Sequence, residues 1–142
     1  MEWVVLFVLF IVLYFLYNFF KAFNKDKHDL EFKTLDQKFF GIVSLLNKAA
    51  FNNEGEVTRI NMREFSLFKE ESNQIIYFQY STGHLTIEWK FIYLHKEVSL
   101  HKKFDYVRNI SIIEQGIIGE KLINEMSELI HVHKKNVWDE IA

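Results

Sequence analysis

Histidines and carboxylates are the side chains whose spacing could support metal binding or acid–base catalysis in this chain, which has six histidines. His131 and His133 lie two positions apart on a predicted helix and point in different directions, whereas a helical metal pair needs a spacing of four. His95 and His101 could share a strand face, but six residues of strand would separate them by about 20 Å. His95 and Glu97 share a strand face and could form a dyad, although such pairs are common by chance. The histidines therefore predict no metal site, and we expect structural or solvated roles for them.

Short motifs for phosphate binding or nucleophilic catalysis are absent from the sequence. The GIIG segment at 116–119 lacks the Gly-Lys-Ser/Thr ending of a phosphate-binding loop, and no Gly-x-Ser-x-Gly sequence occurs. The densest carboxylates, Glu70 and Glu71, fall in a predicted turn where water would solvate them. The chain has no cysteine, which excludes disulfides, thiolate metal sites and cysteine nucleophiles. We therefore predict no catalytic residue, no cofactor and no metal, and nothing in the sequence favours an enzyme.

The elements that must position any functional side chain begin with an apolar segment at the N-terminus. The 18 residues from Trp3 to Phe20, WVVLFVLFIVLYFLYNFF, carry no charge. As a helix they would span about 27 Å, close to the ~30 Å hydrocarbon core of a bilayer. The segment predicts a single transmembrane anchor over residues 1–23. The residues expected at the membrane interfaces are Trp3, Tyr17, Lys21, Lys25 and Lys27.

A cleaved signal peptide and a buried core helix are the alternative interpretations of this segment. A signal peptide begins with positive charge and ends in a small-residue cleavage site, but no Lys or Arg precedes Lys21 and only Ala22 is small in the exit NFFKAFNKDK. A core helix is disfavoured because the segment is apolar on every face and the chain is too short to surround it. The favoured interpretation is an uncleaved signal anchor. Because positive flanks stay cytoplasmic, three lysines place the C-terminal domain in the cytoplasm, and a reversed topology stays open.

Length and charge limit what the remainder of the chain can be. The 142 residues carry a net charge of −2, which argues against nucleic acid as the main partner because phosphate binding requires a basic surface. Residues 24–33 form a charged juxtamembrane linker that could continue the membrane helix for a turn or two. Residues 34–142 are then sufficient for one soluble domain.

Helix signals lie at both ends of this domain. Thr34 followed by Gln37 matches a capping box and predicts a helix over about 34–51. Ser111 followed by Glu114 matches another and predicts a helix to about Lys135, with a short amphipathic tail over 136–142. The buried stripe of the last helix is expected to consist of Ile113, Ile117, Ile123, Met126 and Ile130. Its glycines, Gly116 and Gly119, are expected to allow close approach to the sheet, with a ligand or partner groove as the alternative.

Period-two patterns fill the region between these helices. They predict strands at about 57–68, 74–80, 85–93 and 97–107, with a tight hairpin connection at 81–84. The fold class is therefore α+β: an N-terminal transmembrane helix, then a two-layer domain of order α-β-β-β-β-α. Its antiparallel meander sheet is expected to pack one face on the two helices.

The strand at 74–80 has apolar residues on both of its faces, which is typical of a contact surface on an antiparallel sheet. We expect a partner to bind around Ile76, Phe78 and Tyr80, with Trp138 near the C-terminus as a second candidate.

These features favour a membrane-anchored, non-enzymatic interaction module, an accessory, assembly or scaffold subunit of a membrane-associated complex. The expected partners are the lipid bilayer and another membrane or cytoplasmic protein, and the oligomeric state is not predicted. The alternative is a membrane-tethered small-molecule or lipid-binding domain whose curved sheet encloses an apolar cavity. An enzyme with an unrecognised site that includes His95 or His101 is the third hypothesis.

Overall fold

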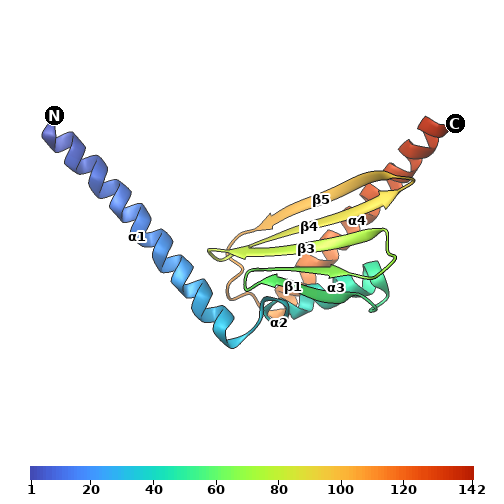
Figure 1. Ribbon diagram of the computed structural model, residues 1–142, viewed down its shortest axis with the longest axis horizontal. Coiled ribbons are helices and arrows are strands. Elements are labelled where there is room, and N and C mark those ends of the chain that lie inside the picture. Colours follow the sequence, from blue (N-terminus) through green and yellow to red (C-terminus); the bar gives the residue numbers. More distant parts are fainter.

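The computed structural model describes the backbone of residues 1–142 and the side chains of all of them except Phe32. Figure 1 shows a long N-terminal helix that meets a domain in which helices cover one side of a sheet. The elements are, in chain order, α1 (Glu2–Phe32), α2 (Leu35–Lys38), α3 (Phe40–Phe51), β1 (Glu56–Asn61), β2 (Glu64–Phe68), β3 (Gln74–Ser81), β4 (His84–Tyr93), β5 (Lys96–Phe104) and α4 (Ile112–Ile141). The five strands pair in the order β1-β2-β3-β4-β5, and every pair is antiparallel. The predicted α+β class with an antiparallel meander is confirmed.

The sheet has one strand more than the sequence predicted, because the segment at 57–68 folds as two strands. A two-residue turn at Met62 and Arg63 joins β1 to β2. The side-chain Oδ1 of Asn61 accepts a hydrogen bond of 2.8 Å from the Arg63 backbone N–H, which is the local interaction of an Asx turn.

One face of the sheet forms the core with α3 and α4. The side chains of β2, β3 and β4 on this face are almost wholly buried: Phe65, Leu67, Ile76, Phe78, Tyr80, Leu85, Ile87, Trp89 and Phe91. Ile76 is opposite Trp89 and Phe78 is opposite Ile87, so the register places them on the same face. From the helices, Ile42, Leu46, Leu122 and Met126 complete this core.

Both predicted capping boxes are present, but the helix bounds differ from the prediction. The expected helix at 34–51 is divided into α2 and α3 at Phe39, which leaves helical geometry with φ −106° and ψ 31°. Phe39 is wholly buried, and its ring centre lies 5.6 Å from that of Tyr80. At the other end of the domain, Glu114 N–H donates to the Ser111 hydroxyl at 3.1 Å. The helix that begins there is α4, which includes the expected tail and ends at Ile141.

The predicted buried stripe of α4 is wrong in its first two turns. Ile113 and Ile117 are 74% and 62% exposed, whereas Met126 is buried as expected. Gln115 is the residue that faces α3 here: its Oε1 accepts from Gly41 N–H at 2.9 Å, and its Nε2 donates to Lys38 O at 3.0 Å. Two buried hydrogen bonds thus fix the rotation of α4 and turn both isoleucines outward.

The two glycines of α4 have different environments. A Cβ on Gly119 would lie 2.8 Å from Leu45 Cδ1, so this glycine allows close approach, to α3 rather than to the sheet. A Cβ on Gly116 would meet nothing within 4 Å among the described atoms. Gly116 therefore borders open space rather than the wall of the ligand or partner groove that was the alternative expectation for these two glycines.

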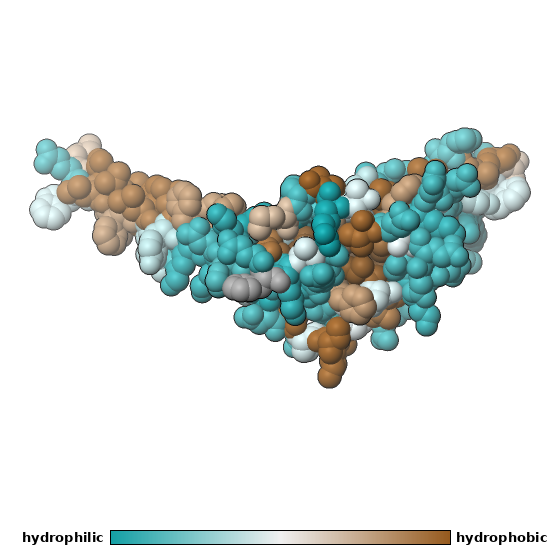
Figure 2. All heavy atoms as spheres, turned by 60° about the horizontal axis from the view of Figure 1, so that its bottom comes forward, coloured by the Kyte–Doolittle hydropathy of each residue, from teal (hydrophilic) through white to brown (hydrophobic). Residues whose placement is uncertain are grey.

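The N-terminal helix α1 has two parts with different surroundings. Its first part is long and apolar enough to cross a membrane, and none of that apolar window is buried. Figure 2 shows this part as a mainly hydrophobic arm, while the visible face of the domain is mainly hydrophilic with separate hydrophobic patches. The second part, which includes the charged segment from residue 24, stays helical to Phe32 and contacts the domain through Asp26 and Leu30, both buried.

Candidate functional site

The most unusual buried group in the structure is the carboxylate of Asp26, whose side chain is 0% exposed. Its Oδ2 accepts a hydrogen bond of 3.0 Å from Arg63 Nη1, and its Oδ1 accepts one from Arg108 Nη2. Its Oδ2 also accepts from the backbone N–H of Thr82 in the β3–β4 turn. A buried carboxylate is stable only when charged or polar donors replace its water, and here three donors from three parts of the domain do so.

The two arginines also bind the backbone of α1. Arg63 Nη2 donates to Phe23 O at 3.2 Å, and the guanidinium carbon lies 4.1 Å from the centre of the Phe23 ring. Arg108 Nη2 donates to Ala22 O at 3.2 Å, and its Nε lies 3.3 Å from Asp29 Oδ2. We call Asp26, Asp29, Arg63, Thr82 and Arg108 the junction cluster, because its interactions join α1 to the domain.

Local geometry explains how these residues reach one another. Arg63 lies in the two-residue turn between β1 and β2, and Arg108 follows β5 at the same end of the sheet. The β3–β4 turn at this end has positive φ at both central residues, Thr82 at 50° and Gly83 at 79°. This is the turn geometry that suits the twist of a two-residue hairpin, and glycine adopts it readily. The predicted hairpin at 81–84 is confirmed.

Burial, together with the charges of the junction cluster, shifts the pKa values of two neighbouring side chains. Burial lowers the pKa of Lys38, although Asp29 and Asp26 partly oppose this effect. Lys38 Nζ donates to Arg108 O at 2.7 Å. Burial raises the pKa of Tyr80, and the nearby Arg108 guanidinium offsets part of the rise. The phenol of Tyr80 is therefore neutral at physiological pH.

The chemistry of the junction cluster is that of attachment. Its carboxylate is occupied by two guanidinium groups and a backbone amide, so no lone pair is directed at a substrate position. Among the described residues, no group of three or more His, Cys, Asp or Glu side chains is placed to hold a metal ion. The cluster holds a helix that is long enough to span a bilayer.

Two open grooves flank the junction cluster. The larger, about 770 Å³, lies between α1 and the segment after β5, and its lining includes Lys21, Lys25 and Arg108. The second, about 450 Å³, lies beside the β3–β4 turn and includes His84. His84 Nδ1 is 2.8 Å from Asp105 Oδ1, and the imidazole makes an edge contact with the ring of Tyr106.

The sequence reasoning missed this His84–Asp105 pair, which long-range strand pairing creates. A signal for it existed in principle, because His84 begins the strand after the predicted hairpin and Asp105 directly follows the strand paired with it. Asp105 is 55% exposed, so water competes for the pair and weakens it as a catalytic dyad. His95 and His101 lie elsewhere: His95 is in the β4–β5 turn and His101 is on the outer face of β5.

The predicted partner residues do not lie together on the surface. Ile76, Phe78 and Tyr80 are 0%, 1% and 0% exposed, so the expectation that they face outward is wrong. Period-two alternation separates two faces but does not say which one the helices cover, and here they cover the face with the larger side chains. Trp138 is 58% exposed near the end of α4. The expected interface residues Trp3, Tyr17, Lys21, Lys25 and Lys27 are all exposed on α1.

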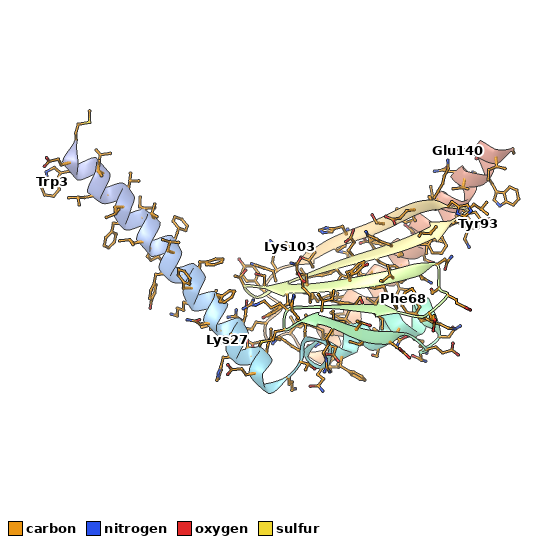
Figure 3. The ribbon with its side chains drawn as sticks, in the orientation of Figure 1. Trp3, Lys27, Phe68, Tyr93, Lys103 and Glu140 are labelled. Atoms are coloured by element: carbon orange, nitrogen blue, oxygen red, sulfur yellow. The ribbon has the colours of Figure 1, made fainter. Side chains whose placement is uncertain are left out.

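The face that the helices leave uncovered carries a different apolar group. We call Phe68, Ile75, Tyr77 and Ile92 the outer-face cluster. Phe68 is opposite Ile75 across the β2–β3 pair, and Ile75 is opposite Lys90 across the β3–β4 pair. Lys90 Nζ lies 5.8 Å from the centre of the Tyr77 ring. Phe68 and Ile92 are 37% and 45% exposed. Figure 3 shows Phe68 on β2, away from the end of the sheet that contacts α1.

Comparison with known proteins returns no matching family model, no matching curated protein and no matching solved structure.

Proposed function

We propose that this protein is a single-pass, membrane-anchored interaction module without enzymatic activity, an accessory or scaffold subunit of a membrane-associated complex. The apolar part of α1 anchors it, and the domain lies on the cytoplasmic side, where Lys21, Lys25 and Lys27 favour retention. The partner is another membrane or cytoplasmic protein.

The observation that carries this proposal is the outer-face cluster on a sheet face that no helix covers. Its apolar side chains are surrounded by Glu88, Lys90, Glu97 and His101 on the same face. An apolar centre with a charged rim is the usual composition of a protein-binding surface. The junction cluster adds to this, because it fixes the orientation of that face relative to the anchor.

The test is affinity purification of the full-length protein from native membranes in mild detergent, followed by mass spectrometry. We expect a stoichiometric partner with the wild-type chain and its loss with Phe68→Glu/Ile92→Glu. Ile113→Glu/Ile117→Glu is the matched control, since it places the same two charges on exposed isoleucines of α4. A separate Trp138→Glu variant tests the second candidate surface.

Retention of every partner by the Phe68→Glu/Ile92→Glu variant would remove the outer-face cluster from the proposal. A wild-type protein that elutes without any partner would reject the interaction-module function itself.

A further inference from the structure

The larger groove lies where the apolar part of α1 meets its charged part. Its α1 wall consists of residues three and four positions apart, which places them on one helix face: Tyr17, Phe20, Lys21, Asn24, Lys25 and His28. Arg108 and Asn109 form the opposite wall. From Tyr17 to His28 the helix rises about 16 Å. The groove thus begins within the apolar segment and ends in the charged part of α1.

The charge of this groove is positive and incompletely neutralised. Asp29 is the only acidic residue in its lining, and it is paired with Arg108 at 3.3 Å. Arg108 is further neutralised by Asp26 behind it. Among the described residues, neither Lys21 nor Lys25 has a carboxylate oxygen within 4.0 Å of its ammonium group. Two ammonium groups one helical turn apart therefore face an open space without a counter-ion from the protein.

The end of the groove that lies toward the N-terminus of α1 is apolar. Tyr17 and Phe20 line it, and both are exposed residues of the uncharged segment. A ligand that satisfies both ends needs an anionic group next to hydrocarbon. Asn24 and Asn109 add amide groups that can donate hydrogen bonds to phosphate oxygens.

We propose that the groove between α1 and the Arg108–Asn109 segment binds the phosphodiester headgroup of an anionic phospholipid, held by Lys21 and Lys25. The acyl chains of this lipid lie along Tyr17 and Phe20. The site is independent of the outer-face cluster and of any protein partner.

The experiment counts the lipids that stay bound to the full-length protein when it is released from nanodiscs with equal amounts of phosphatidylcholine and phosphatidylglycerol, by native mass spectrometry. The test variant is Lys21→Gln/Lys25→Gln. The matched control is Lys27→Gln/Lys33→Gln, which removes the same charge from exposed lysines that do not line the groove. Figure 3 labels Lys27 on this part of α1. Thermal unfolding of each variant verifies that it is folded.

We expect the wild-type protein to retain phosphatidylglycerol over phosphatidylcholine by about tenfold. The control variant should keep this preference, and the test variant should lose it. Calorimetric titration of inorganic phosphate into the protein in phosphatidylcholine nanodiscs distinguishes a lipid from a soluble anion.

Three outcomes would overturn the proposal. Equal loss in both double variants would show general attraction to a charged surface. Binding of inorganic phosphate without enrichment of phosphatidylglycerol would assign the groove to a soluble anion. Absence of any lipid preference in the wild-type protein would show that the groove binds no headgroup.

Discussion

At the scale of single residues, Asp26 determines how α1 and the domain are joined. It is the one charged side chain that is fully buried among those described, and its partners come from the β1–β2 turn, the β3–β4 turn and the segment after β5. A buried ion pair is weak support for stability in itself, because desolvation offsets much of the attraction. Removing the Asp26 charge, however, leaves the guanidinium groups of Arg63 and Arg108 without a counter-charge. The stability cost of this loss can be measured with an Asp26 variant.

We predict that Asp26→Asn lowers the free energy of unfolding of the domain by about 2–3 kcal/mol, after allowance for the partial exposure of both arginines. Urea unfolding of the full-length protein in detergent, followed by the fluorescence of the buried Trp89, measures this change. Glu31→Gln is the control, because Glu31 is an exposed carboxylate on the same helix. Equal midpoints for Asp26→Asn and wild type would show that α1 is not held by this carboxylate.

A second residue-scale prediction concerns acid stability. Burial alone would raise the pKa of Asp36, but hydrogen bonds from Arg59 and Thr34 outweigh it and lower the pKa. A carboxyl group whose pKa is lower in the folded state stabilises the fold above its usual pKa, and this contribution disappears as pH falls through the folded value. Asp36→Asn should therefore cost about 0.5 kcal/mol at pH 7 and less at about pH 2, which is below the ordinary aspartate pKa.

Urea midpoints of wild type and Asp36→Asn at these two pH values provide the comparison. Glu70→Gln, at an exposed position between β2 and β3, should show no such difference. A constant gap between Asp36→Asn and wild type at both pH values would contradict the assignment.

At the scale of elements, α4 shows how one helix satisfies two packing requirements. Its middle packs closely on α3 at Gly119, whereas its first turns expose Ile112, Ile113 and Ile117. Helix propensity favours alanine over glycine at every interior position of a helix. Whether a glycine-to-alanine substitution stabilises the domain therefore depends on the space available for the added Cβ.

We predict that Gly116→Ala stabilises the domain by about 0.5–1 kcal/mol, because alanine gains helix propensity in open space. Gly119→Ala should yield no such gain and should destabilise the domain, since its Cβ would approach Leu45 Cδ1 to 2.8 Å. Thermal unfolding of both variants in parallel makes each the control for the other. A gain for Gly119→Ala equal to that for Gly116→Ala would mean that α3 and α4 are not in close contact there.

The β4–β5 turn provides a second element-scale prediction. Leu94 and His95 have backbone φ angles of 48° and 66°. Residues other than glycine and asparagine adopt this left-handed conformation only at a cost in free energy. Leu94→Asn/His95→Gly should raise the free energy of unfolding by about 1 kcal/mol, because Asn-Gly suits this turn. Leu94→Ser removes the exposed apolar side chain without the favoured turn sequence and should have a smaller effect. An unchanged midpoint for the double variant would show that this turn carries no strain.

At the scale of the whole molecule, α1 and the domain form an open angle in which the two termini lie far apart (Figure 1). The junction cluster lies at the vertex, and the larger groove lies beside it. Rotation of α1 in the membrane would therefore reorient the outer-face cluster. Under the proposed function, this arrangement would link the topology of the anchor to the direction in which a partner is presented.

Because the chain has no cysteine, single-cysteine labelling tests that topology directly. We predict that Lys48→Cys reacts with a membrane-impermeant maleimide only in inside-out vesicles, and that Glu2→Cys reacts only in right-side-out vesicles. Lys48 is exposed on α3, and Glu2 begins α1. The opposite pattern would reverse the topology, and extraction of the protein by alkaline carbonate would reject the anchor.

The sequence by itself determined the features that depend on neighbouring residues. The long apolar helix, the capping boxes at Thr34 and Ser111 and the hairpin at 81–84 follow from local composition and backbone chemistry. Short turns between successive strands likewise favour an antiparallel meander, which explains why the fold class could be predicted although the strand at 57–68 was not divided.

Only the tertiary structure decided which groups far apart in the chain meet. Asp26 is paired with Arg63 and Arg108, which are 37 and 82 positions away, and no local pattern selects those partners. The same reason explains the error at Ile76, Phe78 and Tyr80: alternation defines two faces, but the packing of α3 and α4 chooses the one that is buried. The sequence therefore located the long apolar helix, while its attachment to the domain, the groove beside it and the exposed apolar face depend on long-range packing.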